Sequence, residues 1–185
     1  MKVIKEQAFN SSPLLTLLAG ITVTTVLGSI HAFSVFLQPL EKQFQTGRAE
    51  ISLIYSGALI FLTISVLLGH RIYPMLSAPL LALITCAVAA IGIIIAGQSQ
   101  TLWVMVLGYS VIFGSANGVG YGFALQISAQ AMPKSRGLAM GTVTAFYAFG
   151  ATIAPYIFNY GLTHGGVAVA MTIYGFIFLI AGFIA

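Results

Sequence analysis

The residues of this chain that could do chemistry are few, and they stand inside long apolar stretches. His31 is an imidazole in such a stretch, and Tyr55, Tyr121 and Tyr147 each place a phenol in similar surroundings. These groups exchange hydrogen bonds, and an imidazole also binds a proton near neutral pH. Ionisable side chains inside a membrane span usually face a cavity or the bundle interior. We predict that the four line a polar cavity. A neutral structural role for His31, and interfacial positions for the tyrosines, stay open as alternatives.

Other polar residues at similar depth are weaker candidates for lining the cavity, because such residues more often form hydrogen bonds between helices. They are Ser52, Ser56, Asn117 and Gln126.

Covalent catalysis has little support in the sequence. An intramembrane serine protease needs a nucleophilic serine beside a histidine base, and the nearest stretch, Gly114–Gly118 with Ser115, lacks the usual Gly-x-Ser-Gly pattern. His164 falls in a predicted loop, and the single Cys86 excludes a disulfide or a cysteine metal cluster within one chain. We therefore expect no enzyme activity, no metal and no cofactor.

The distribution of charge decides the class of protein. Only 5% of the 185 residues are charged and 59% are hydrophobic, and neither 72–133 nor 137–185 contains Asp, Glu, Lys or Arg. A bilayer core of about 30 Å needs roughly 20 apolar residues per helix. The chain is therefore predicted to be an all-α integral membrane protein with the lipid bilayer as its partner. Its net charge of +4 flanks the spans, so it does not indicate nucleic-acid binding.

The apolar stretches predict six transmembrane helices in one domain, 1–185. The expected spans are 14–37, 51–68, 75–97, 102–125, 138–160 and 167–185. The first is too long for the apolar part of a signal peptide, so it is expected to stay in the mature protein.

Basic residues between the spans predict the orientation. One side carries Lys2, Lys5, Arg71, Lys134 and Arg136, whereas the other carries only Lys42 and Arg48. Because Lys and Arg concentrate on the cytoplasmic side, the N-terminus is expected to lie in the cytoplasm. The protein is expected in the cell membrane (inner or plasma membrane).

Small residues recur every four positions in the fourth and fifth spans, which is typical of close helix packing in lipid. These positions are Gly114, Gly118, Gly122, Gly137 and Gly141. The same faces are candidates for sliding or rocking during transport.

A faint internal repeat has an offset of 90 residues, placing Gly28–Phe33 opposite Gly118–Phe123. Copies an odd number of spans apart lie in opposite orientations, so the pattern predicts an inverted 3+3 repeat.

Five segments together resemble the major facilitator superfamily, and within it the oxalate/formate antiporter and monocarboxylate-porter group. They are Gly118–Gly122, Met132–Ala139, His31–Phe36, Gln38–Leu40 and Glu50–Tyr55. The resemblance implies a twelve-helix fold of which this chain is the N-terminal six-helix half. It also implies a substrate site lined by His31, Phe33, Tyr121 and Tyr147, with Ser52 and Tyr55 as weaker members, and cationic residues supplied by the other half.

The chain departs from that family in two places. The loop Gly69–Met75 keeps a glycine and Arg71 but lacks the usual acidic residue, which puts the charge-relay gate in doubt. The sixth span stops at Ala185 with no polar flank, so we expect a truncated chain. Arg71, Lys134 and Arg136 remain the candidates for gating in the cytoplasmic loops.

The leading hypothesis is a secondary transporter that moves small organic anions (mono- or dicarboxylates) by alternating access, driven by exchange or by a proton gradient. Its expected partner is a C-terminal six-helix half, or a second copy of the chain in a homodimer. The alternatives are a facilitator for another small solute and a self-associating or truncated six-span protein without transport activity.

Overall fold

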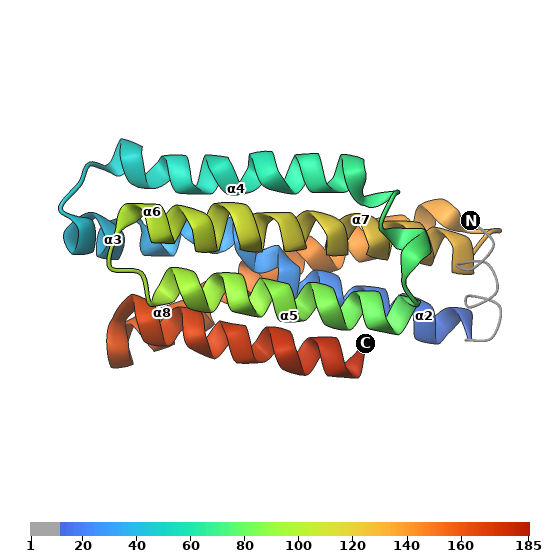
Figure 1. Cartoon of the computed structure of the whole chain (residues 1–185). Coiled ribbons are helices and arrows are strands. Elements are labelled where there is room, and N and C mark those ends of the chain that lie inside the picture. The colour runs from blue at the N-terminus through green and yellow to red at the C-terminus, as the bar shows by residue number, and fades with distance from the viewer. Residues whose placement is uncertain (1–11) are drawn as a thin grey trace.

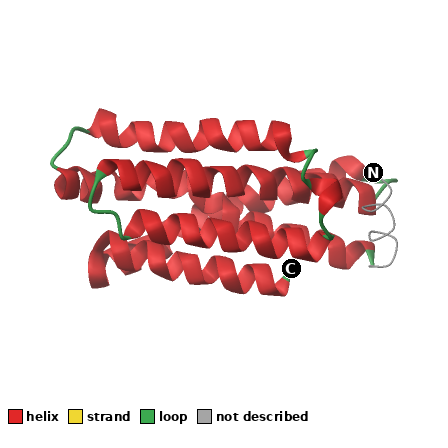
Figure 2. Cartoon of the chain, viewed as in Figure 1, coloured by secondary structure: helices red, strands yellow, loops and turns green. Residues whose placement is uncertain are grey.

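The computed structural model describes residues 12–185, and every regular element in this range is helical (Figure 2). The order is α2 (Pro13–Leu27), a 3₁₀ segment (Gly28–Phe36), α3 (Leu37–Phe44), α4 (Arg48–Gly69), a 3₁₀ turn (Tyr73–Met75), α5 (Ala78–Gly97), α6 (Leu102–Met105), a π-helical segment (Val106–Phe113), α7 (Gly114–Ala131) and α8 (Arg136–Ile184). Lys2 and Lys5, counted above for orientation, lie outside the described residues.

Five helical stretches are long and apolar enough to cross a membrane. They are Pro13–Phe44, Arg48–Gly69, Ala78–Gly97, Leu102–Ala131 and Arg136–Ile184. The prediction of an all-helical chain with membrane-length apolar helices is thus confirmed for the described residues. The helices run past several predicted ends: α3 continues to Phe44 and α7 to Ala131.

The predicted fifth and sixth spans both lie within α8, whose backbone is not helical at Gly165 and Gly166. Gly166 has φ 72° and ψ −162°, a conformation open almost only to glycine. The chain reverses there, giving a first arm (136–164) and a second arm (167–184). The arms meet closely beside the reversal, because a Cβ on Gly161 would run into Ala170.

The helices run roughly along one axis in an elongated bundle (Figure 1). Glycines mark which neighbours touch. Gly118 of α7 meets Leu62 of α4, and Gly97 of α5 meets Met171 of the second arm. Gly28, directly after α2, meets Tyr147 of the first arm. The start of α2 and the end of α8 lie at the same end of the bundle (Figure 1).

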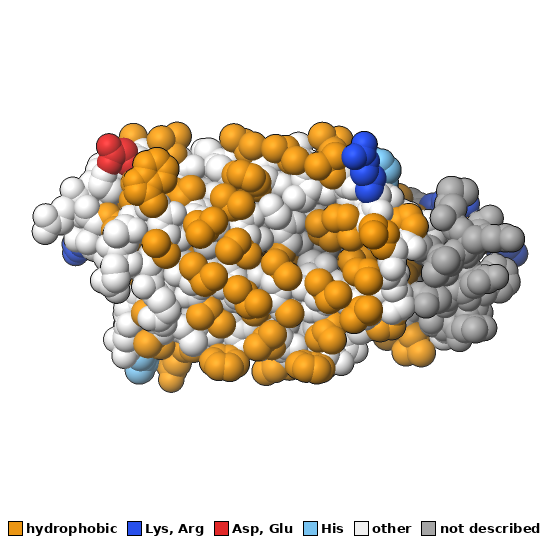
Figure 3. Space-filling model, in the orientation of Figure 1, with side chains coloured by type: hydrophobic (Ala, Val, Ile, Leu, Met, Phe, Trp, Pro, Cys, Tyr) orange, Lys and Arg blue, Asp and Glu red, His pale blue; other side chains and the backbone are white. Residues whose placement is uncertain are grey.

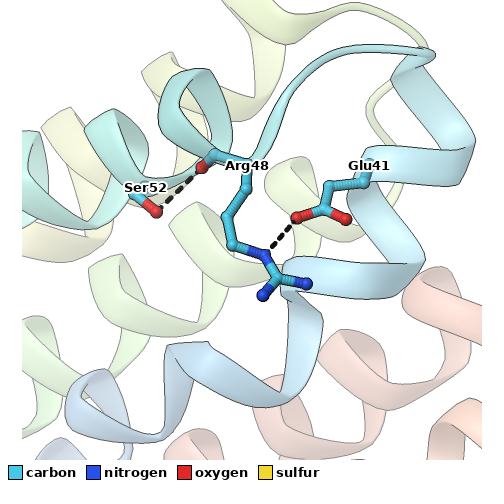
Figure 4. A network of polar contacts seen from close by, with 3 residues as sticks. All are labelled: Glu41, Arg48 and Ser52. Atoms are coloured by element: carbon cyan, nitrogen blue, oxygen red, sulfur yellow. Dashed lines mark hydrogen bonds and ion pairs between the residues drawn. The ribbon is translucent and has the colours of Figure 1, made fainter.

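A tight turn joins α3 to α4 at the other end. Gln45 takes the left-handed conformation with φ 50°, and the Arg48 Nε donates to Glu41 Oε1 at 2.7 Å across the turn (Figure 4). The Arg48 side chain is exposed, so solvent screens this ion pair and its contribution to stability is small. It fixes the turn more than it stabilises the bundle.

The surface carries large apolar side chains along the length of the bundle and charged ones near its ends (Figure 3). Leu53, Leu67 and Phe183 are 68%, 68% and 77% exposed. Contiguous apolar surface of this extent is rare on soluble monomers. It fits a helical wall that faces lipid.

The two groups of regularly spaced glycines differ in what covers them. A Cβ on Gly114 would lie 2.7 Å from the Ala58 carbonyl oxygen, and one on Gly118 would meet the Leu62 carbonyl. Gly122 faces Tyr73. Gly137 and Gly141, in contrast, are exposed, and a Cβ there would find nothing within 4 Å. Within residues 12–185 these two glycines pack against no helix, because the first arm turns Ala139 and Val143 inward instead.

The loop Gly69–Met75, between α4 and α5, is held by Tyr73. Its ring packs on Phe123 with centroids 5.6 Å apart, between Gly69 and Gly122. The hydroxyl is buried without a hydrogen-bond partner, and burial raises the pKa of Tyr73 to about 12. A steric contact therefore fastens this loop to α7.

The glycine contacts generate a matched pair of substitutions. Gly118→Ala should destabilise the chain by about 1–3 kcal/mol, because the new methyl group overpacks the α4–α7 contact. Gly141→Ala should leave stability unchanged or raise it by up to about 1 kcal/mol, since alanine favours helix. Thermal unfolding in detergent measures both. Equal losses in the two variants would contradict the packing described here.

Candidate functional site

Four side chains predicted as cavity residues lie side by side on one face of the bundle. The His31 Nδ1 and Tyr55 Oη are 2.8 Å apart. The His31 ring meets the Tyr147 ring edge-on at 5.3 Å between centroids, and the Tyr147 ring lies 4.6 Å from that of Tyr121. We call these four residues the His–Tyr cluster. It draws on the 3₁₀ segment, α4, α7 and the first arm of α8.

The cluster is open on one side. His31 is exposed, Tyr55 and Tyr121 are partly exposed, and Tyr147 is only 8% exposed. Tyr121 Oη lies 3.3 Å from the hydroxyl of Thr144, which is also exposed. The face therefore presents an imidazole and hydroxyl groups amid apolar walls.

A change of helix type within the helical stretch Pro13–Phe44 determines where His31 lies. The α-helix α2 ends at Leu27, and the next nine residues, Gly28–Phe36, form a 3₁₀ segment. A 3₁₀ stretch this long is uncommon and often marks a functional site. Backbone carbonyls at membrane depth must find donors inside the protein, because lipid offers none.

Three buried side chains from other helices supply those donors. Asn117 Nδ2 donates to the Leu27 carbonyl at 2.6 Å. Tyr109 Oη donates to the Ile30 carbonyl at 3.1 Å, and Tyr174 Oη to the Val26 carbonyl at 3.4 Å. Donors from the π-helical segment, α7 and the second arm thus converge on one junction.

The remaining predicted substrate residues lie outside the cluster's open face. Phe33 is 2% exposed and packs behind the cluster, with its ring stacked on Tyr55 at 5.9 Å and 4.8 Å from that of Tyr109. The Ser52 hydroxyl donates to the Arg48 carbonyl at 2.8 Å, beside the ion pair with Glu41 (Figure 4). Phe33 supports the rings, whereas Ser52 serves the start of α4.

The three cations predicted for gating lie away from the cluster. Arg71 follows α4, and Lys134 and Arg136 flank the start of α8, all three exposed. Within residues 12–185 none of them forms an ion pair, whereas Glu41 and Arg48 do.

Sequence reasoning missed Thr144, Tyr109 and Tyr174, and it ranked Asn117 low. One signal was present: Gly28–Ser29 is a pair of the kind found at helix kinks. The partners that stabilise such a junction come from positions far along the chain, so sequence alone does not identify them.

The cluster is chemically suited to donating hydrogen bonds and binding a proton. In the described part of the chain, no three His, Cys, Asp or Glu residues gather as a metal site would require. An apolar groove of about 520 Å³ lies at the end of the bundle where α2 begins and α8 ends, lined by residues such as Val23, Ala82 and Phe123. It shares no residue with the cluster.

The chain matches no protein-family model and no curated protein sequence. What the fold and composition define is therefore the broad class, an all-helical chain compatible with a multi-pass membrane protein.

A pair of tyrosines tests the junction. Tyr109→Phe should lower stability by about 0.5–1.5 kcal/mol, because it removes the hydrogen bond that the buried Tyr109 hydroxyl donates to the Ile30 carbonyl. Tyr73→Phe should cost nothing, since the Tyr73 hydroxyl has no partner to lose. Thermal unfolding in detergent compares the two, and a larger loss in Tyr73→Phe would refute this account.

Proposed function

We propose that the chain is a six-span bundle of a secondary transporter that moves small organic anions by alternating access. The observation that carries the proposal is the His–Tyr cluster, an open polar face built beside a break in a membrane-length helix. Transporter sites commonly lie near the bilayer midplane at discontinuous helices. An imidazole and several hydroxyls amid apolar walls suit a small carboxylate.

Six spans in an inverted 3+3 arrangement form part of this proposal. The reversal at Gly165–Gly166 supports counting α8 as two spans. An offset of 90 relates Leu27 to Asn117, and these two residues are hydrogen-bonded. Two residues related by a two-fold axis can contact each other only near that axis. The bond therefore supports a pseudo-two-fold axis that passes close to Leu27 and Asn117.

The helix pairs support the same symmetry. The offset maps the contact between Gly118 and Leu62 onto Gly28 and Thr152. Gly28 in fact lies nearest to Tyr147, five positions before the mapped Thr152, with Ala151 slightly farther away. The α4–α7 contact is thus matched, at the level of the helix pair, by the contact between Gly28 and the first arm of α8.

A second six-helix bundle, either a C-terminal half or another copy of this chain, is proposed to cover the open face of the His–Tyr cluster. Within the described spans no Lys or Arg lies beside the cluster, so the cation for a carboxylate would come from that bundle. The uncovered Gly137 and Gly141 are suited to a close contact with it. They equally favour the second candidate, a self-associating membrane protein, whose mark would be crosslinking through this face without any transport.

Transport by tyrosine variants tests the site. In proteoliposomes, Tyr121→Phe and Tyr147→Phe should each lower uptake of oxalate or pyruvate about tenfold, the effect of one bond worth about 1.4 kcal/mol. Tyr121→Phe removes a hydroxyl of the open face, and Tyr147→Phe removes the hydroxyl that holds the Tyr147 ring to Asn117. Tyr156→Phe is the control, because Tyr156 is 76% exposed on the same arm. Unchanged uptake in both cluster variants, with insertion intact, would remove the cluster as the site.

We base the proposed orientation on the basic residues: the protein lies in the cell membrane with its N-terminus in the cytoplasm. Gly47→Cys and Gly137→Cys form a matched pair, as both glycines are exposed with no atom near a Cβ. An impermeant thiol reagent should label the first in intact cells and the second only after permeabilisation. Cys86 is fully buried and should stay silent. The reverse pattern would invert the proposed topology.

A further inference from the structure

Asn117 is a fully buried amide in the first turn of α7. Burying an amide is costly unless its polar atoms are bonded, and both ends of this one are. Its Nδ2 donates to the Leu27 carbonyl at 2.6 Å, and its Oδ1 accepts from Tyr147 Oη at 2.8 Å. A carbonyl only accepts, so the nitrogen must face Leu27 and the amide has one orientation.

Close helix packing at this level does not need an amide. Gly118 and Gly28 already let the neighbouring backbones approach, and small apolar residues would fill the same space. Tyr109 and Tyr174 also bond to the junction, but Asn117 bonds in addition to a member of the His–Tyr cluster. Its two bonds end on different helices.

Those two bonds reach both supports of His31. Leu27 is the last residue of α2, and His31 follows four residues later in the 3₁₀ segment. Tyr147 holds the His31 ring edge-on at 5.3 Å between centroids. A displacement of Asn117 would therefore change the position of His31 relative to Tyr147.

We infer that Asn117 is a positioning residue, whose amide holds the 3₁₀ segment carrying His31 in register with Tyr147. The inference rests on the proposed function of the His–Tyr cluster as the substrate site. Asn117 touches neither the open face nor the substrate, and it acts through the two residues that it joins.

The first test follows His31 directly, without transport. The chain is labelled at its histidines, placed in lipid nanodiscs and observed by NMR. Asn117→Ala should shift the His31 resonances while leaving those of His70 and His164 in place, since both lie at the ends of the bundle. Gln43→Ala is the control, because it removes a bond of the same kind, Gln43 Nε2 to the Ser99 carbonyl at 2.8 Å. It should leave His31 unshifted.

The second test uses a nearly isosteric acid. In Asn117→Asp, the neutral carboxyl group can donate to the Leu27 carbonyl and accept from Tyr147, whereas the carboxylate can only accept. Buried carboxyls titrate up to about pH 9. The ratio of variant to wild-type pyruvate uptake should therefore fall as the pH rises from about 5 to about 9. Asn117→Ala should raise the KM about tenfold at every pH, with the maximal rate kept within about twofold.

The outcomes separate the two proposals. If Asn117→Ala leaves His31 unshifted, or shifts all three histidines alike, Asn117 only packs and the inference is wrong. A flat pH ratio in a folded Asn117→Asp variant would overturn it as well. A selective His31 shift in a chain whose wild type moves no anion would keep the positioning role and overturn the proposed function.

Discussion

The demand that every buried backbone group find a partner governs this structure. Lipid supplies no hydrogen bonds, so a departure from α-helical bonding inside a span survives only where other side chains complete it. The junction after Leu27 meets this condition through Asn117, Tyr109 and Tyr174. Each of these donors comes from a different segment, so all three bonds are made only when those segments are packed together. The position of His31 is thus a property of the whole bundle.

The same demand separates two kinds of surface. Most of the exterior is covered with apolar side chains such as Leu53 and Phe183, as a lipid-facing wall requires. The face with His31, Thr144, Gly137 and Gly141 is different, because it combines polar groups with small residues. Such a face makes poor contact with a lipid chain, whereas a second protein surface or the water of a cavity can form hydrogen bonds with it.

Sequence was sufficient for the features that depend on local composition. The charge-free stretches predicted long apolar helices. Residue type, depth in the predicted spans and the family resemblance together selected His31, Tyr55, Tyr121 and Tyr147, which the fold gathers into one cluster. It was insufficient where the outcome depends on which element covers which. Gly118 and Gly141 share the same spacing pattern, yet only Gly118 is covered by a helix. The 3₁₀ segment depends on donors as much as 148 residues away, namely Tyr174 to Val26.

The fastening of the loop after α4 has a consequence for how this sequence can vary. Tyr73 occupies space that exists only because positions 69 and 122 carry no side chain. A larger residue at either glycine requires a smaller one at position 73, so the three positions should change together among descendants of this chain. Because the contact is steric and uncharged, raising the ionic strength would not loosen it, unlike a loop fastened by an acid–base pair. Natural substitutions at positions 69, 73 and 122 should therefore change side-chain volume together and introduce no charge.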